Sequence, residues 1–153
     1  MADLDLTLKR ILKAPRHAVW RCWTEPRHMA PWFMPKPHRV SDIVIDLRPG
    51  GRFASLMHVD GAEIPNDGSI LEVVPETRLA FTDLMLADWQ PVAKPGLGFT
   101  AVLTFADHPE GTEYTAVARH GSAATMKRHE EMGFHEGWGT VADQLEAYAR
   151  GLK

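Results

Sequence analysis

The sequence predicts an α+β fold in which a curved antiparallel sheet of about six to seven strands wraps around one long C-terminal helix. Strand-like segments separated by turn signals fill the middle of the 153-residue chain. Residues 123–152 then repeat apolar side chains at helical spacing. Three of the five tryptophans lie within residues 14–33, where prolines allow only short helices. A sheet, a helix and an aromatic segment that packs on both favour a fold with an internal cavity.

Length and composition indicate a single domain over residues 1–153. The net charge is −3 and no cluster of Lys and Arg occurs, which argues against a nucleic-acid partner. The single cysteine, Cys22, forms no intrachain disulfide, as is typical of the cytoplasm. The first residues lack the pattern of a signal peptide, and no apolar stretch is long enough to span a membrane. We therefore predict a cytoplasmic protein with no membrane partner.

The first half of the chain alternates short apolar segments with turns. Prolines at the first turn favour helices over residues 15–24 and 26–31. Period-two alternation between turn signals predicts strands over residues 4–13, 40–47, 52–59, 62–74, 78–86, 99–105 and 112–120. The strand over 62–74 is expected to be interrupted near Pro65–Gly68, and residues 87–97 form an irregular loop with Trp89 as a second lid or as surface packing.

A single helix over about residues 123–152 has one continuous apolar stripe. Its members are Phe134, Trp138, Val141, Leu145, Tyr148 and Leu152. Extending this stripe backwards at 100° per residue places Lys127 and Glu130 on the inward side and His129 on the opposite side. Gly137 is also expected to face inward. Its missing side chain either opens room for a cavity or allows helix and sheet to approach closely there.

Short motifs along nearly the whole chain resemble the activator of heat-shock-protein-90 ATPase homologue (AHSA-type) family, within the START-like (SRPBCC) superfamily. They are Ala14-Pro15, Val19-Trp20, Trp23-Thr24, Pro31-Trp32-Phe33, Asp46 to Gly51, Asp60-Gly61, Gly68, Ile70 to Pro75, Arg78-Leu79, Phe81-Thr82, Gly111-Thr112, Gly137-Trp138 and Leu145. The resemblance implies a helix-grip fold, also described as Bet v-like, with an elongated apolar cavity between sheet and helix. It also implies a link to chaperones and the stress response, but it names no ligand, because the family is not uniform in function.

Candidate ligand-binding residues combine aromatic walls with a few polar groups, as small-molecule pockets do. They are Trp32, Phe33, His58, Phe81, His120, Glu130, Phe134 and Trp138. Trp32 and Phe33 follow a proline and are expected at the pocket rim, and His58 and His120 could meet across the cavity. The alternative for the aromatic residues is plain core packing. For Lys127 and Glu130, the alternative is a solvated ion pair beyond the sheet.

Three functions remain open from the sequence. The leading one is binding of a small hydrophobic or amphipathic ligand in the internal cavity. The second is co-chaperone-like activation of an ATPase through a protein partner, and the third is a cavity enzyme that uses His120 or Glu130 as acid and base. We expect no cofactor, and the histidine spacing does not suit a metal site. The chain is expected to be a monomer or a homodimer.

Overall fold

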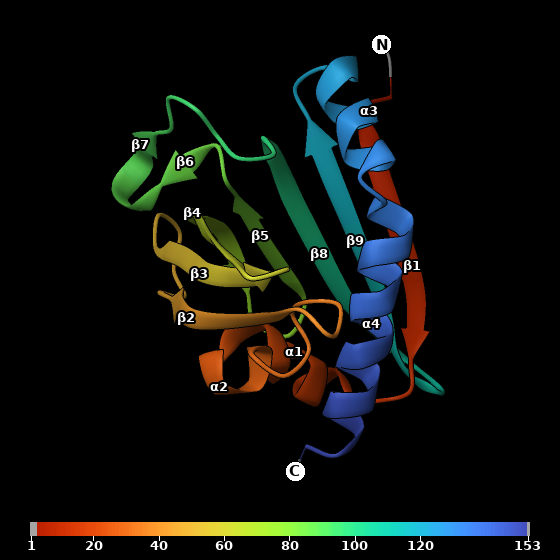
Figure 1. Ribbon diagram of the computed structural model, residues 1–153. Helices are drawn as coiled ribbons and strands as arrows, with labels where there is room; N and C mark the ends of the chain where they lie inside the picture. Colours follow the sequence, from red (N-terminus) through yellow and green to blue (C-terminus); the bar gives the residue numbers. More distant parts are fainter. Residues whose placement is uncertain (1–2, 153) are drawn as a thin grey trace.

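The computed structural model describes residues 3–152 and contains a seven-stranded antiparallel sheet with strand order β1-β9-β8-β5-β4-β3-β2. The strands of this sheet are β1 (Asp5–Leu12), β2 (Arg39–Ile45), β3 (Arg52–Val59), β4 (Ala62–Val74), β5 (Arg78–Thr82), β8 (Phe99–His108) and β9 (Gly111–His120). A separate two-stranded ribbon pairs β6 (Met85–Leu86) with β7 (Gln90–Pro91) around the short 3-10 helix η1 (Ala87–Trp89). The sheet curves strongly, so that β2 and β3 cross the direction of β8 and β9 (Figure 1). The predicted fold class is therefore confirmed.

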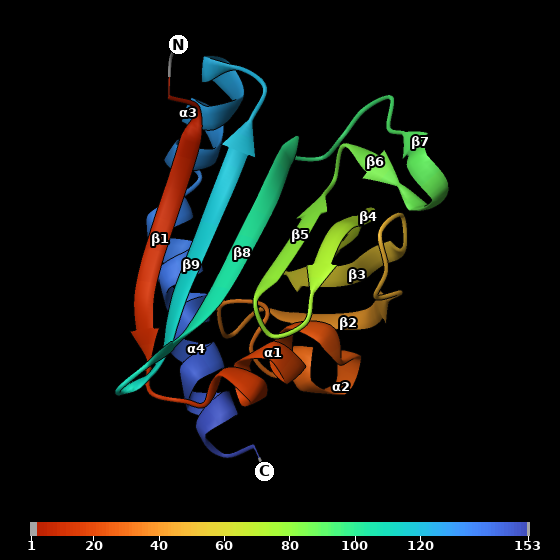
Figure 2. The ribbon, with the colours of Figure 1, turned by 180° about the vertical axis from the view of Figure 1, so that it is seen from behind.

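Four helices accompany the sheet in the described part of the chain. They are α1 (Arg16–Thr24), α2 (Pro26–Met29), α3 (Ala123–Glu131) and α4 (Phe134–Arg150). α4 runs along β8, β9 and β1, while α1 and α2 lie beside β2 near the C-terminal end of α4 (Figure 1). From behind, the convex face of the sheet carries no helix (Figure 2). The helices therefore all lie on the concave side or at its ends.

Small buried side chains lie on β8 and β9. Ala101, Ala116 and Ala118 are at most 1% exposed. Register pairs Ala101 with Ala118, and residues paired across antiparallel strands share one face. α4 turns Leu145 and Ala149, both fully buried, toward the core. These alanines and the apolar stripe of α4 belong to one hydrophobic core.

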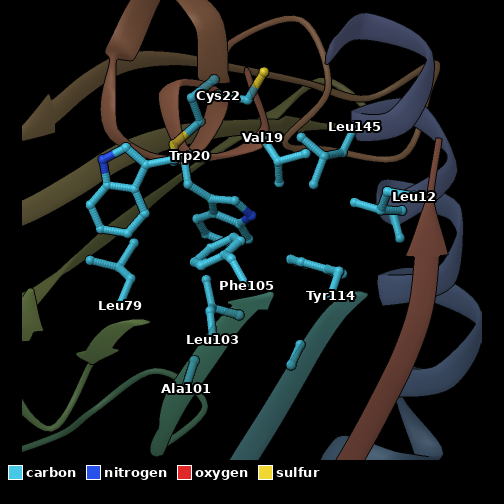
Figure 3. Packing of buried hydrophobic residues seen from close by; sticks show 14 of the residues in the cluster. Leu12, Val19, Trp20, Cys22, Leu79, Ala101, Leu103, Phe105, Tyr114 and Leu145 are labelled. Atoms are coloured by element: carbon cyan, nitrogen blue, oxygen red, sulfur yellow. The ribbon is translucent and has the colours of Figure 1, made fainter. Parts of the chain in front are cut away.

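The core continues beneath α1. Phe105 and Tyr114, paired across β8 and β9, point from the sheet toward Val19 of α1 and Leu145 of α4 (Figure 3). Trp20 packs edge-on against Phe105 with ring centroids 5.6 Å apart. The N-terminal helices thus close one end of the concave side with apolar side chains.

The C-terminal region consists of two helices, which corrects the prediction of one. α3 ends at Glu131, and Gly133 adopts a left-handed conformation with φ of 91° before α4 begins. Few residues other than glycine adopt this conformation without strain. Ser122 caps α3 by accepting a hydrogen bond from the backbone N–H of Thr125. α3 is therefore an independent element with its own helical phase.

β4 is continuous through Pro65, so the expected interruption is wrong. Residues 62–69 pair with β3, whereas pairing with β5 covers only residues 69–74. Over residues 62–68, the edge of β4 that faces away from β3 is therefore not paired with β5. A proline is tolerated there because its missing N–H removes no hydrogen bond on that open side.

The strand predicted over 78–86 ends at Thr82, and the residues after it form the β6–β7 ribbon. Trp89 in this segment is 55% exposed, and its indole lies over Gly50. A Cβ atom at Gly50 would approach the indole to 3.0 Å. This position agrees with surface packing of Trp89 and not with a lid.

Candidate ligand-binding site

Five aromatic side chains lie in two groups of neighbouring rings, of which Phe81 and Phe99 line the same small cavity. The aromatic surface consists of Phe33 after α2, Phe53 on β3, Phe81 on β5, Phe99 on β8 and Trp138 on α4. Ring centroids lie 6.2 Å apart for Phe33 and Phe53, 4.7 Å for Phe53 and Phe81, and 6.4 Å for Phe99 and Trp138. Phe33, Phe99 and Trp138 are only partly buried. Apolar area therefore remains accessible at this place in the fold.

A small cavity opens among three of these rings. It has a volume of about 30 Å³. Its lining consists of Phe53, Asn66, Asp67, Gly68, Phe81, Thr82, Asp83 and Phe99. This volume is about that of one water molecule. This cavity is far smaller than the elongated one implied by the family resemblance, so the rings that line it would have to shift to admit a ligand.

Trp32 lies behind the aromatic surface and not at its rim, contrary to the prediction. Its side chain is fully buried, and its indole N–H donates to the backbone carbonyl of His28 at 2.7 Å. The backbone N–H of Trp32 also bonds to the carbonyl of Met29, so the chain turns inward directly after α2. Phe33, the next residue, is partly exposed, in line with a rim position. A proline-rich loop therefore contributes one core residue and one surface residue.

Two buried histidines lie next to Phe99, at the end of the aromatic surface that includes Trp138. Nε2 of His120 lies 2.9 Å from Nδ1 of His129, and Nδ1 of His120 lies 2.7 Å from the carbonyl oxygen of Leu4. We call this arrangement the histidine pair. The side chains of His120 and His129 are 7% and 5% exposed. The rings of Phe99 and Phe134 lie 4.8 Å and 5.1 Å from His129. The pair is thus a polar group within apolar walls.

Burial lowers the pKa of His129 to about 4. The cost of removing an imidazolium from water is the largest cause, and the neighbouring His120 and Arg128 act in the same direction. Asp83 acts in the opposite direction but does not compensate. His129 is therefore neutral throughout the physiological pH range.

Lys127 and Glu130 are exposed and His129 is buried, which reverses the predicted orientation. The stripe of α4 cannot be extended backwards through Gly133, because its left-handed conformation ends the helical phase. The exposed Glu130 is therefore not one of the polar groups near the aromatic surface. Gly133 itself was the signal in the sequence, since glycine commonly terminates helices.

His58 does not meet His120. Its Nε2 lies 2.7 Å from the hydroxyl of Ser41 on the neighbouring strand β2. Five predicted residues do gather at the site: Phe33, Phe81, His120, Phe134 and Trp138. The structure adds Phe53, Phe99 and His129, of which sequence patterns gave no indication.

Glycine plays different roles at two positions of α4. At Gly137 a Cβ atom would meet nothing within 4 Å, which excludes the close approach considered from the sequence. The close approach occurs instead at Gly139, where a Cβ atom would lie 2.9 Å from the guanidinium of Arg10 on β1.

Polar contacts hold the rim of the small cavity in place. The carboxylate of Asp83 accepts hydrogen bonds of 2.9–3.0 Å from the backbone N–H groups of Leu97, Gly98 and Phe99. Arg128 of α3 donates to the carbonyls of Gly96 and Leu97 at 3.2 and 2.9 Å. α3 is thereby fixed to the segment that leads into β8 and positions Phe99.

A larger groove lies on another side of α4. Its volume is about 450 Å³, and it is open to solvent. The residues that line it are Pro31, Lys36, Thr140, Asp143, Gln144, Ala147 and Tyr148. Gln144 accepts from the backbone N–H of Lys36 and donates to the carbonyls of Trp32 and Met34. This groove contains none of the predicted ligand-binding residues.

Within residues 3–152, no group of three or more His, Cys, Asp or Glu side chains is arranged to hold a metal ion. No helix in that part of the chain is long and apolar enough to cross a bilayer.

Comparisons with known proteins agree with this architecture. Residues 13–150 match the family described as "Activator of Hsp90 ATPase homolog 1-like protein". A crystal structure of a protein from Nitrosomonas europaea is 46% identical, with a TM-score of 0.92, over 97% of this chain and 95% of that one. A protein from Mycobacterium smegmatis is 28% identical, with a TM-score of 0.80, over 98% and 93% of the two chains. A comparison with curated proteins finds no significant match.

Proposed function

This chain belongs to the activator of Hsp90 ATPase homolog 1-like family, and from that premise we propose that it binds a small, largely apolar or amphipathic molecule on the aromatic surface. The observation that carries the proposal is the small cavity with walls of Phe53, Phe81 and Phe99, which the partly exposed rings of Phe33 and Trp138 and the buried His129 contact. Ligand pockets in proteins commonly combine apolar walls with a few placed polar groups.

The size of the cavity sets a condition for binding. A volume of about 30 Å³ holds no organic ligand, so rings that line it would move aside. Phe99 is the partly exposed ring among them, whereas Phe53 and Phe81 are buried. A two-ring aromatic compound would replace ring–ring contacts by contacts with itself and bury its own apolar area.

Titration calorimetry with 2-naphthol tests this proposal. We expect a dissociation constant of about 0.1 mM or tighter for a compound of this size. Phe99→Ala should weaken binding by roughly tenfold because it removes a wall of the cavity. The control is Thr140→Phe, which obstructs the groove on the other side of α4 and should leave the affinity unchanged. Absence of binding, or weakening by Thr140→Phe alone, would contradict the proposal.

A second candidate, activation of a chaperone ATPase through direct contact, is supported by the description of the matching family. This activity needs no internal ligand. The discriminating measurement is the ATPase rate of the Hsp90-type chaperone from the same organism, with and without an excess of this protein. A rate that rises with protein concentration supports this candidate, and an unchanged rate counts against it.

A further inference from the structure

The histidine pair offers a ligand one hydrogen-bonding atom whose chemical character follows from its partners. The carbonyl oxygen of Leu4 only accepts hydrogen bonds. Nδ1 of His120, 2.7 Å away, must therefore carry a proton and donate it. When His120 carries a single proton, that proton is on Nδ1 and the other nitrogen is an acceptor. Nε2 of His120 then has a lone pair that faces His129.

The same reasoning fixes the second ring. Nδ1 of His129 lies 2.9 Å from the accepting Nε2 of His120, so Nδ1 of His129 donates. His129 is neutral at physiological pH, because burial lowers its pKa to about 4. Its remaining nitrogen, Nε2, therefore carries a lone pair and no proton.

Among residues 3–152, Nε2 of His129 has no hydrogen-bond partner, although the side chain is only 5% exposed. It is also not fully enclosed: among the described residues, the one fully buried side-chain nitrogen or oxygen without a partner is Nε1 of Trp23. The acceptor is therefore reachable by solvent or by a ligand. A ligand that covers it without supplying a donor removes it from water at a cost in free energy, which a ligand with a donor avoids.

The position of His129 connects this acceptor with the aromatic surface. Its ring lies 4.8 Å from that of Phe99, which forms one wall of the small cavity, and 5.1 Å from Phe134. Phe134 in turn lies 5.5 Å from Trp138. His129 itself does not line the small cavity, so a molecule reaches its ring where Phe99 moves aside.

We infer that His129 is a specificity-determining residue of the aromatic surface, and that the ligands bound there carry a hydroxyl proton donor, as phenols and apolar alcohols do. This inference rests on the proposed function. A carboxylate anion is disfavoured, because its lone pairs would face the lone pair of Nε2 within apolar walls. An ether offers no proton and leaves Nε2 unsatisfied.

The test compares 2-naphthol with 2-methoxynaphthalene, which differ in the presence of the hydroxyl proton. In wild-type protein we expect 2-naphthol to bind roughly tenfold tighter or better, the effect of one buried hydrogen bond. In His129→Phe the two compounds should bind with equal affinity. The control is His135→Phe, an exposed histidine near the start of α4, which should retain the wild-type preference.

Each outcome has one meaning. Equal affinities in the wild type, or a preference that survives in His129→Phe, would overturn the inference and leave the proposed function standing. Binding of neither compound would overturn both. Should His129→Phe fail to fold, the ¹⁵N resonance of Nε2 of His129 in the wild type gives the answer. It should shift on addition of 2-naphthol but not of the ether, and equal shifts with both would overturn the inference.

Discussion

Nδ1 of His129 on α3 lies 2.9 Å from Nε2 of His120 on β9. The contact joins a short helix to the end of the sheet through two imidazole rings, each at most 7% exposed. The position of α3 therefore depends on the protonation state of the buried His129.

The first prediction concerns the pH dependence of stability. His129 has a pKa of about 4 in the folded protein and an ordinary value of about 6.5 when unfolded. Above pH 6.5 it is neutral in both states. As the pH falls from 6.5 toward 4, the unfolded state binds the proton first, so the free energy of unfolding decreases by up to about 1.4 kcal/mol per pH unit.

Urea unfolding at several pH values between 7 and 4 checks this dependence. His129→Leu should remove much of the slope over this range, whereas His135→Gln, at an exposed position, should retain it. Equal slopes in wild type and His129→Leu would show that His129 does not stay neutral in the folded protein.

The second prediction concerns the break between α3 and α4. Gly133→Ala forces an alanine to φ of 91° and should lower the free energy of unfolding by about 1–2 kcal/mol. Gly137→Ala, four residues further along, places a methyl group in open space within a helix and should raise it by about 0.5–1 kcal/mol. Thermal unfolding of the two variants compares them directly. Effects of the same sign would contradict the described break.

The third prediction concerns the loop that carries Phe33. Gln144 makes three hydrogen bonds to backbone groups of residues 32–36. Gln144→Ala should cost about 2 kcal/mol of stability. Gln144→Glu should cost more, because a carboxylate cannot donate to the two carbonyls. Asp143→Ala, an exposed neighbour, is the control. Chemical denaturation in which Gln144→Glu matches the wild type would exclude this role.

The fourth prediction concerns the thiol of Cys22. Its side chain is fully buried, and burial raises its pKa to about 12. The nucleophilic thiolate is therefore scarce at pH 8. Ellman's reagent should react over hours in the native protein and within minutes in urea. Rapid reaction of the native protein would show that α1 opens readily from the core.

Local signals in the sequence defined much of the fold. β3 extends over Arg52–Val59 as predicted, because Gly50-Gly51 and Asp60-Gly61 mark its two ends. The break at Gly133 was missed because the apolar stripe of α4 seemed to continue through it. Because the helical phase of α4 was extended through Gly133, the orientation predicted for His129 was wrong.

The candidate site was only partly predictable. Trp138 was identified because the helical pattern places it on the apolar stripe, and Phe81 belongs to one of the motifs of the family resemblance. The two partners of His120 were not identified. Leu4 and His129 contact His120 only when β1, β9 and α3 have packed. Contacts between segments far apart in sequence leave no mark in local periodicity.

The most direct test of the central claim is the location of a bound ligand. Intermolecular nuclear Overhauser effects from 2-naphthol to the protein report which side chains it touches. We predict contacts with the rings of Phe81, Phe99 and Trp138. Contacts confined to Thr140 and Ala147 in the open groove, or no contacts at any concentration that the solubility of 2-naphthol allows, would contradict binding on the aromatic surface.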